Sequence, residues 1–320
     1  MSVAKPTELI AFLEGLGIRP KKGLSQNFLI DGNIIRKIIS TGDVLPRDVV
    51  VEVGPGPGAL TQALLESGAT VIAIEKDRIL AKALERLQTP DGRLHVYEAD
   101  FLTFPIEKVL EEVLQQKQAS NDPANTEPAK KAKFIANLPY HLTTPILERV
   151  IPLHMLISRV VIMVQKEVAQ RMTAVPGSRV YGSLTVFLSF FGKQSYAFSV
   201  SSRCFMPAPK VDSAVVAMDL QAPPLAGKDL DAFFKMTRGA FGQKRKMVRT
   251  SLRELYSTAL VEKALIECGV NPMTRPEELS LESFLFLFEK LKKAISVGDG
   301  LLKRCQATAL QIFAASLLFF

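Results

Sequence analysis

The chain has 320 residues, of which 48% are hydrophobic and 22% are charged, so it can bury a sizeable core in one large domain or in a larger and a smaller one. The formal net charge of +8 favours a polyanionic partner, although many basic proteins bind none. No apolar run reaches the roughly 18 residues that a membrane-spanning helix needs, and no secretory signal is apparent. Three widely spaced cysteines (Cys204, Cys268 and Cys305) offer no metal knuckle, so we expect a reduced, cytoplasmic protein that holds no metal. We also expect it to be a monomer.

From residue 49 onward, short β-branched runs alternate with helix-like segments. The runs cover residues 49–53, 71–75, 94–98, 134–137 and 160–165, and the helix-like segments between them cover 59–67, 78–87 and 143–153. Strands that alternate with helices and are apolar on both faces predict a parallel, doubly wound α/β sheet. Two further runs, at 196–200 and 214–220, flank a proline-rich turn and are expected to form an antiparallel pair at the edge of the sheet.

A glycine-rich loop follows the first predicted strand. The sequence VEVGPGPGALT at 51–61 places Gly54, Gly56 and Gly58 between a β-run and a helix. Glycine at this point lets the backbone approach a ligand closely and adopt a positive φ. The G-x-G-x-G spacing differs from the G-x-G-x-x-G of dinucleotide-binding proteins and, together with Glu52, favours a methyltransferase loop. A tight turn without a ligand is the alternative.

Acidic residues end the next two strands. Glu75 stands about 20 residues beyond the loop, where a carboxylate can accept hydrogen bonds from both hydroxyls of a ribose. Asp100 follows the third strand and can accept from an adenine amino group, with Phe101 as an apolar flank. Each acid alone is more often a helix cap or a surface charge. Because ligands of such sheets bind at the carboxyl ends of the strands, the three features together predict an adenosyl cofactor.

The fourth strand runs into Asn137, Leu138, Pro139 and Tyr140. The amine of adenine is a poor nucleophile, and the Asn137 side-chain oxygen and the Leu138 carbonyl can draw its hydrogens out of the ring plane. Pro139 fixes the turn, and Tyr140 offers a flat face on which a base can stack. Methyl transfer would then depend on orientation and polarisation, without a covalent intermediate. A structural Asn-Pro turn with a buried tyrosine is the alternative.

The remaining segments divide the chain. Residues 115–133 are polar and predict a mobile surface insertion, and the linker QAPPLAGKD at 221–229 ends the alternation. Helical segments follow at 230–241, 247–256, 261–268 and 281–293. We therefore expect a catalytic domain over 1–221 that begins with an N-terminal flap over roughly 1–45, and a small all-helical domain over 222–297. Residues 298–320 form an apolar tail to which we assign no function.

The stretch at 235–253 of the helical domain is strongly basic. It contains no acid and seven basic residues: Lys235, Arg238, Lys244, Arg245, Lys246, Arg249 and Arg253. A continuous helix would present Lys246, Arg249 and Arg253 along one face. The expected RNA-binding residues are Lys244, Arg245, Lys246, Arg249 and Arg253. An ordinary solvated face is the alternative.

These motifs resemble those of one enzyme family, the bacterial ribosomal RNA adenine dimethyltransferases that modify two adjacent adenines in the terminal hairpin of small-subunit RNA. The similarity spans roughly residues 21–290 and rests on KKGLSQNFLID at 21–31, EVGPGPGALT at 52–61, IEKD at 74–77, ADFL at 99–102, NLPY at 137–140, QKEVAQRM at 165–172, FMPAPKVDSAVV at 205–216, FGQKRKMVRTSL at 241–252 and RPEELSLESF at 275–284. The resemblance implies a Rossmann-like, class I S-adenosylmethionine-dependent methyltransferase sheet, with immature small ribosomal subunits as the partner.

The resemblance also implies roles for individual residues. The residues that would contact S-adenosylmethionine are Asn27, Leu29, Gly54, Glu75, Asp100 and Asn137. The catalytic set would comprise Asn137, Leu138, Pro139, Tyr140 and Phe205, with Tyr140 and Phe205 flanking the target adenine. The chain departs from the family at Ser25, where glycine is usual, and at His141, where asparagine is usual. We assign His141 no catalytic role, because methyl transfer needs no dedicated base.

Three other interpretations remain open. The first is a sister enzyme that modifies a large-subunit adenine; the FMPAPKVDS loop and the RPEELSLESF segment favour the small-subunit enzyme. The second is an RNA-binding assembly or transcription factor that kept the fold and lost the activity, which the intact acceptors and aromatic residues of the site disfavour. The third is a nucleotide-dependent oxidoreductase, which the glycine spacing and the NLPY turn disfavour.

Overall fold

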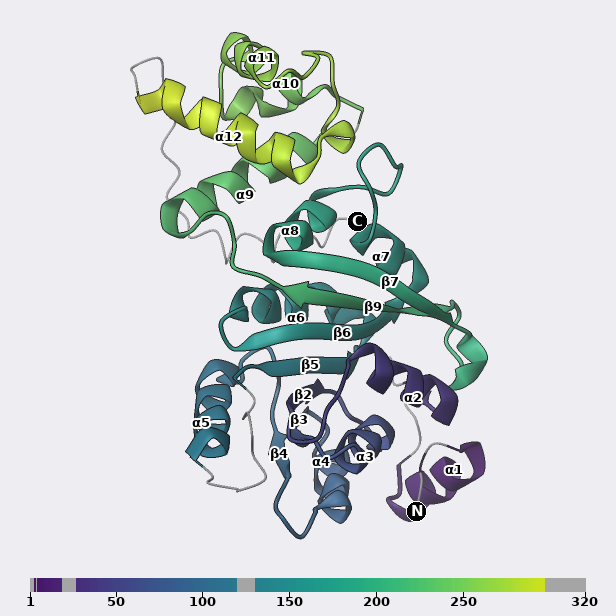
Figure 1. Cartoon of the computed structure of the whole chain (residues 1–320). Coiled ribbons are helices and arrows are strands. Elements are labelled where there is room, and N and C mark those ends of the chain that lie inside the picture. The colour runs from purple at the N-terminus through teal and green to yellow at the C-terminus, as the bar shows by residue number, and fades with distance from the viewer. Residues whose placement is uncertain (1–2, 4, 19–26, 120–129, 244, 297–320) are drawn as a thin grey trace. The chain divides into compact units, whose positions relative to one another are not determined.

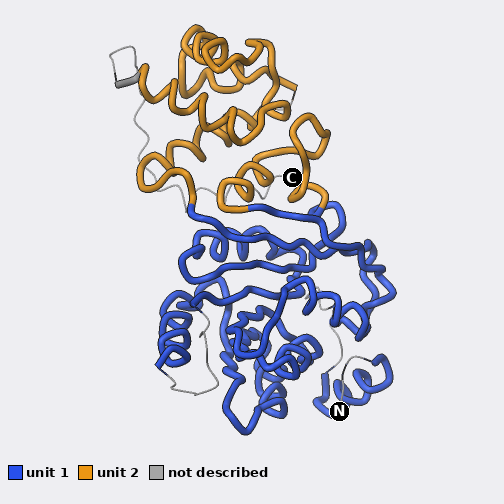
Figure 2. Tube along the Cα trace, in the orientation of Figure 1, with its two compact units in different colours: residues 1–169, 193–222 blue, residues 170–192, 223–320 orange. Residues whose placement is uncertain are grey.

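The chain forms two compact units in the computed structural model, which describes residues 3, 5–18, 27–119, 130–243 and 245–296 (Figure 1). The first unit comprises Met1–Ala169 and Lys193–Ala222, and the second comprises Gln170–Gly192 and Pro223–Phe320 (Figure 2). From the sequence we predicted a single domain boundary, at 221–222, with residues 170–192 in the first domain. The structure differs because the apolar helix at 183–191 packs its aromatic rings against those of the helical unit.

The first unit is built on a seven-stranded sheet with the order β4-β3-β2-β5-β6-β9-β7. Its strands are β2 (Val49–Val53), β3 (Thr70–Glu75), β4 (Leu94–Glu98), β5 (Ala132–Asn137), β6 (Ile157–Gln165), β7 (Gly192–Val200) and β9 (Ser213–Leu220). The five strands from β4 to β6 are parallel, and β9 runs antiparallel to β6. The predicted Rossmann-like sheet is therefore confirmed, and the predicted edge strands β7 and β9 neighbour one another at its end (Figure 1).

Burial of β-branched residues explains the parallel part of this sheet. Every residue of β2 and β3 is buried, as expected for strands that are covered on both faces. One face, which includes Val50 and Val71, packs against apolar side chains of α2 (Gly32–Thr41) and α3 (Ala59–Glu66). A short two-stranded sheet, β1 (Phe28–Leu29) with β8 (Phe205–Met206), joins two segments that lie far apart in the sequence.

The other helices of the first unit are α1 (Pro6–Gly15), α4 (Arg78–Leu84), α5 (Ile106–Ala119), α6 (Thr143–Val150) and the start of α7 (Lys166–Met172). All but α1, which precedes residue 49, follow the predicted alternation with strands. The predicted insertion at 115–133 is too long, because α5 continues to Ala119 and β5 begins at Ala132; residues 120–129 lie outside the described part of the chain. Polar composition alone does not separate the solvent face of a helix from a loop.

The second unit is helical and contains α8 (Ser183–Phe191), α9 (Gly227–Phe241), α10 (Val248–Ser251), α11 (Thr258–Glu267) and α12 (Leu281–Ser296). Its core is aromatic: the Phe190 ring lies 5.0 Å from that of Phe233, which lies 5.7 Å from that of Phe288. The predicted helix at 247–256 is interrupted, because α10 ends at Ser251 and a 3-10 turn, η6 (Leu252–Glu254), follows. Among the described residues, no helix is long and apolar enough to cross a membrane.

Candidate functional site

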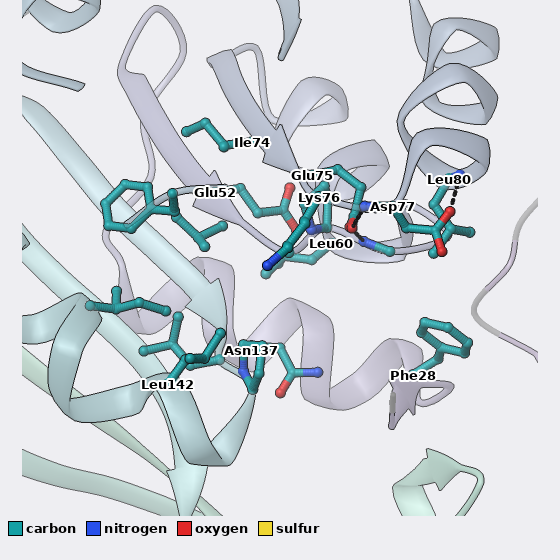
Figure 3. Close-up of a pocket in the computed structure, with 18 of the residues that line it drawn as sticks. Phe28, Glu52, Leu60, Ile74, Glu75, Lys76, Asp77, Leu80, Asn137 and Leu142 are labelled. Atoms are coloured by element: carbon teal, nitrogen blue, oxygen red, sulfur yellow. Dashed lines mark hydrogen bonds between the residues drawn. The ribbon is translucent and has the colours of Figure 1, made fainter. Parts of the chain in front are cut away.

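A cavity of about 400 Å³ opens at the carboxyl ends of the parallel strands in the first unit (Figure 3). Loops after β2, β3, β4 and β5 line it, together with Asn27, Phe28 and Leu29. Most of the predicted cofactor and catalytic residues meet there: Asn27, Leu29, Gly54, Glu75, Asp100, Asn137, Leu138, Pro139 and Tyr140. These residues therefore meet at the predicted edge of the sheet, because the carboxyl ends of parallel strands lie on one side of it.

The glycine loop forms one wall of the cavity. Gly54, Gly56 and Gly58 have φ values of 65°, 57° and 86°, which other residues rarely adopt. Space is also limited, because a Cβ atom at Gly56 would lie 3.0 Å from the Phe28 ring and one at Gly58 would lie 2.7 Å from the Leu84 side chain. Both backbone conformation and close packing therefore require glycine in this loop.

Glu75 connects this loop to the end of β3. Its Oε2 accepts a hydrogen bond from the Gly56 amide over 2.9 Å, and its Oε1 accepts one from the Asp77 amide over 2.9 Å (Figure 3). The residue is buried, and desolvation raises the pKa of its carboxyl although these amides oppose the shift. Glu75 therefore holds the loop in place and also presents a carboxylate to the cavity.

Glu52 is a second buried acid of the cavity, and it was absent from the predicted site residues. It is 2% exposed, and its Oε2 accepts a hydrogen bond from the Thr61 hydroxyl over 2.7 Å. Burial raises the pKa of Glu52 to about 8, partly opposed by that bond and reinforced by the charge of Glu75. The available signal was a carboxylate within the otherwise all-valine strand VVVEV.

Asp100 lies in a more open part of the same cavity. Its Oδ2 lies 2.8 Å from the Lys76 Nζ, and its Oδ1 accepts a hydrogen bond from the Leu102 amide over 2.9 Å. These two hydrogen bonds lower the pKa of the Asp100 carboxyl. Sequence reasoning missed Lys76, although it directly follows Glu75. Phe101 also lines the cavity, as expected for an apolar flank.

The NLPY turn forms the opposite wall. The Asn137 Nδ2 donates to the main-chain oxygen of Asn27 over 3.2 Å, which joins the turn to the segment that begins β1. The Tyr140 hydroxyl lies 2.7 Å from the Ser213 Oγ on β9, and partial burial raises the pKa of this tyrosine. Tyr140 is thus held in a fixed place while part of it faces the cavity.

Phe205, which was expected to flank the target base, does not line this cavity. It is 3% exposed and belongs to the apolar core with Leu29 and Ile35, and its role beside the base stays a prediction. Pairing of β1 with β8 places Phe205 opposite Leu29, which explains its burial. Leu29 lines the cavity even though its side chain is 6% exposed. His141 also lines the cavity and is exposed.

The predicted RNA-binding residues lie in the second unit. Arg245, Lys246 and Arg253 are exposed, whereas Lys244 lies outside the described residues. Arg249 is partnered by an acid from outside the acid-free stretch at 235–253, because its guanidinium forms an ion pair with Glu262 on α11. The break between α10 and η6 also means that no single helix carries all these cations. The expected helical face is therefore wrong, although three exposed cations remain close in sequence.

The cavity fits an adenosyl cofactor. A volume near 400 Å³ falls in the range of small-molecule sites, about 300–1,000 Å³. Buried carboxylate oxygens, main-chain atoms beside glycine and apolar residues such as Phe28 and Leu142 together suit a ligand with hydroxyls, cationic groups and a flat base. Within the part of the chain that the structure describes, no group of three or more His, Cys, Asp or Glu could hold a metal ion.

Comparisons with known proteins agree with this geometry. The family model described as Ribosomal RNA adenine dimethylase matches residues 18–293. "Ribosomal RNA small subunit methyltransferase A" of Protochlamydia amoebophila is 52% identical over 291 residues, which cover 91% of this chain and 98% of that protein. The protein of the same name from Chlamydia muridarum is 44% identical over 287 residues, covering 89% and 97%.

Two solved structures share the fold. The 23S rRNA methyltransferase ErmE superposes with a TM-score of 0.63 and 29% identity, covering 83% of this chain and 100% of that one. A dimethyladenosine transferase from Plasmodium falciparum gives a TM-score of 0.64 at 24% identity, covering 83% and 98%, which supports the fold alone. With the family model matched over most of its length and its glycine loop, acids and NLPY turn gathered around one cavity, the chain belongs to the ribosomal RNA adenine dimethylase family.

Proposed function

We propose that this protein transfers methyl groups from S-adenosylmethionine to the N6 amine of adenines in small-subunit ribosomal RNA, and that its targets are two adjacent adenines of the 3'-terminal hairpin. The observation that carries the proposal is the meeting of two kinds of residue in one cavity. Glu75 and the glycine loop lie on one wall, and the NLPY turn lies on the other. A nucleoside cofactor and a flipped adenine can therefore share the cavity.

The first wall supplies the cofactor contacts. S-adenosylmethionine carries an electrophilic methyl group on a sulfonium. The Glu75 carboxylate is positioned to accept from ribose hydroxyls, and Asp100 to accept from the adenine amino group. The backbone at Gly54, the main chain at Asn27 and Leu29, and the Asn137 side chain complete the proposed contacts.

The second wall supplies the contacts to the target base. The Asn137 side chain and the Leu138 carbonyl accept hydrogen bonds from the amine, and these bonds aim its lone pair out of the ring plane. Pro139 fixes the turn, and Tyr140, held at Ser213, provides the stacking surface. Catalysis by these residues consists of orientation and polarisation.

Small-subunit RNA is favoured over large-subunit RNA as the substrate. Relatives at 52% and 44% identity carry the small-subunit name, whereas the structure named as a 23S methyltransferase is 29% identical. A catalytically silent assembly factor is disfavoured, because Asn137 and Tyr140 are both present and both face the cavity.

The second unit is proposed to dock the RNA. Arg245, Lys246 and Arg253 are exposed and can neutralise phosphates, which would position the RNA without reading its sequence. The proposed partner is an immature small ribosomal subunit in the cytoplasm, with the protein acting as a monomer.

The test is mass spectrometry of ribosomal RNA from a bacterial strain that lacks its own small-subunit dimethylase and expresses this chain. We expect dimethyladenosine to return at two adjacent positions of the small-subunit 3' hairpin. Expression of a Tyr140→Ala variant should restore much less of it. Dimethylation that returns only in large-subunit RNA would contradict the proposal.

A further inference from the structure

A single arginine connects the N-terminal helix to the glycine loop within the first unit. Arg86 lies in η2 (Glu85–Leu87), the 3-10 turn that follows α4. Its Nη2 donates a hydrogen bond to the Pro57 carbonyl over 2.6 Å, and its Nη1 donates one to the Ala83 carbonyl over 2.8 Å. Its guanidinium carbon also lies 4.3 Å from the centroid of the Phe12 ring on α1. Three contacts therefore fix the plane of this guanidinium.

The hydrogen bond to Pro57 reaches the wall of the cofactor cavity. Pro57 lines that cavity and precedes Gly58, the N-cap of α3, whose φ is 86°. A Cβ atom at Gly58 would lie 2.7 Å from the Leu84 side chain and 2.8 Å from the Leu87 side chain. The last turn of α4 and the turn η2 therefore pack directly against the loop. Arg86 thus adds a charged hydrogen bond, a strong class of contact, where the loop is already tightly packed.

The contact with Phe12 reaches a different wall of the same cavity. On α1, Leu9 and Leu13 are buried in a small apolar cluster that also contains Val3, Phe28 and Leu80. Val3 and Phe28 line the cavity, and the Phe28 ring lies against Gly56. The position of α1 therefore sets the position of this apolar wall.

We infer that Arg86 is a positioning residue for S-adenosylmethionine, which holds the glycine loop and the α1 wall in the arrangement that binds the cofactor. Arg86 does not itself line the cavity, so it acts through Pro57 and Phe12. Arg86 as a residue remains exposed, but its contacts desolvate the guanidinium enough to lower its pKa. The inference rests on the proposed cofactor site and adds a residue that neither the glycine motif nor the acids predict.

The test uses the full chain and calorimetric titration with S-adenosylmethionine. Arg86→Gln should weaken binding about tenfold, because it removes a charged hydrogen bond and a cation–π contact. Phe12→Leu should weaken it about threefold. The double variant should bind about as weakly as Arg86→Gln alone, since the stacking contact needs both partners. Arg86→Lys, which keeps a donor for Pro57 but loses the planar stack, should fall between wild type and Arg86→Gln.

A kinetic readout separates positioning from a loss of folding or of chemistry. At saturating cofactor, Arg86→Gln should keep its kcat for methylation within about twofold, while its KM for S-adenosylmethionine rises. The matched control is Arg93→Gln, because Arg93 also donates to two carbonyls, those of Leu65 at 2.7 Å and Ala69 at 3.1 Å, but does not line the cavity. The control should lower the free energy of unfolding and leave cofactor affinity unchanged.

Each alternative outcome has a distinct meaning. Equal affinity of wild type and Arg86→Gln, an equal loss of affinity in Arg93→Gln, or additive effects of Arg86→Gln and Phe12→Leu would overturn the role of Arg86. A wild-type protein that binds no S-adenosylmethionine would instead contradict the proposed function itself. If Arg86→Gln does not fold, Arg86→Lys and Phe12→Leu decide the question, and wild-type affinity in both overturns the inference.

Discussion

Glu75 has two roles that a single substitution would disturb together. Its carboxylate accepts hydrogen bonds from the Gly56 and Asp77 amides and is proposed to accept from the cofactor ribose. Glu75→Ala should therefore reduce S-adenosylmethionine affinity by about 1.5–3 kcal/mol, as expected for the loss of a charged acceptor. Calorimetric titration measures this change. The control is Glu98→Ala, the exposed register partner of Glu75 on β4, and a similar loss of affinity in both variants would contradict the assignment.

Tyr140 is proposed to act through its ring. Tyr140→Ala should lose the stacking contribution of about 1–3 kcal/mol, which appears as a lower kcat/KM for methylation. Tyr140→Phe should keep most of the activity but lose about 0.5–1.5 kcal/mol of folding stability, because its hydroxyl contacts the Ser213 hydroxyl. Ser213→Ala should match the stability loss of Tyr140→Phe. Equal inactivity of the Phe and Ala variants would show that the hydroxyl takes part in catalysis.

Burial of Glu52 makes stability depend on pH. Its carboxyl has a pKa of 4.5 in the unfolded chain and about 8 in the folded protein, so the folded state binds more protons between these values. The stabilisation is complete below pH 4.5 and is lost as the pH rises through 8, with a slope of up to about 1.4 kcal/mol per pH unit. Glu75, whose pKa is also raised, acts in the same direction. Urea unfolding of wild type and Glu52→Gln between pH 5 and 9 should show a flatter dependence for the variant, and parallel curves would contradict the shift.

The sequence correctly predicted which residues meet where their position follows from the end of a strand. Glu75, Asp100 and Asn137 meet at the cavity because parallel strands bring their carboxyl ends together. The burial of Phe205 was not predicted, because it depends on pairing between β1 and β8, which are about 180 residues apart, and no local pattern encodes that pairing. Lys76 was missed because its partner, Asp100, follows a different strand.

At the scale of elements, the buried strands were the easiest to predict. The bounds of β2 and β4 agree with those expected, because a short apolar run between polar or glycine-rich segments is typical of a buried strand. The segment at 247–256 was harder. Its composition suits a helix, but the chain turns at Leu252, a fully buried residue, and tertiary packing overrides local propensity.

The break between α10 and η6 changes which cations are available to RNA. Arg249 is paired with Glu262, so charge reversal should be directed at Arg245, Lys246 and Arg253, which are exposed. The triple Glu variant should bind small subunits more weakly, and the slope of log affinity against log salt should fall by about 0.7–0.9 for each phosphate that the variant no longer neutralises. S-adenosylmethionine affinity should not change. The control is a triple Glu variant of Lys82, Lys130 and Lys193, exposed residues of the first unit. An equal effect in the control, or the parental slope in the test variant, would show that the exposed cations are merely solvated.

At the scale of the whole molecule, two units have separate proposed tasks. The sheet unit contains the cavity, and the helical unit contains the exposed basic residues near α10. The division was visible in the sequence as the end of strand and helix alternation near residue 222. The assignment of 170–192 to the helical unit was not visible, because the apolar helix α8 resembles any buried helix until its aromatic partners on α9 are known.

Methyl transfer with purified components is the most direct test of the proposed dimethylation of small-subunit RNA. The protein and S-adenosylmethionine with a labelled methyl group would be incubated with small and large ribosomal subunits from a strain that lacks small-subunit dimethylation. We predict up to four methyl groups per small subunit, two on each of two adjacent adenines, and none on the large subunit. Label in large-subunit adenines, or no label in either subunit although the cofactor binds, would contradict the account.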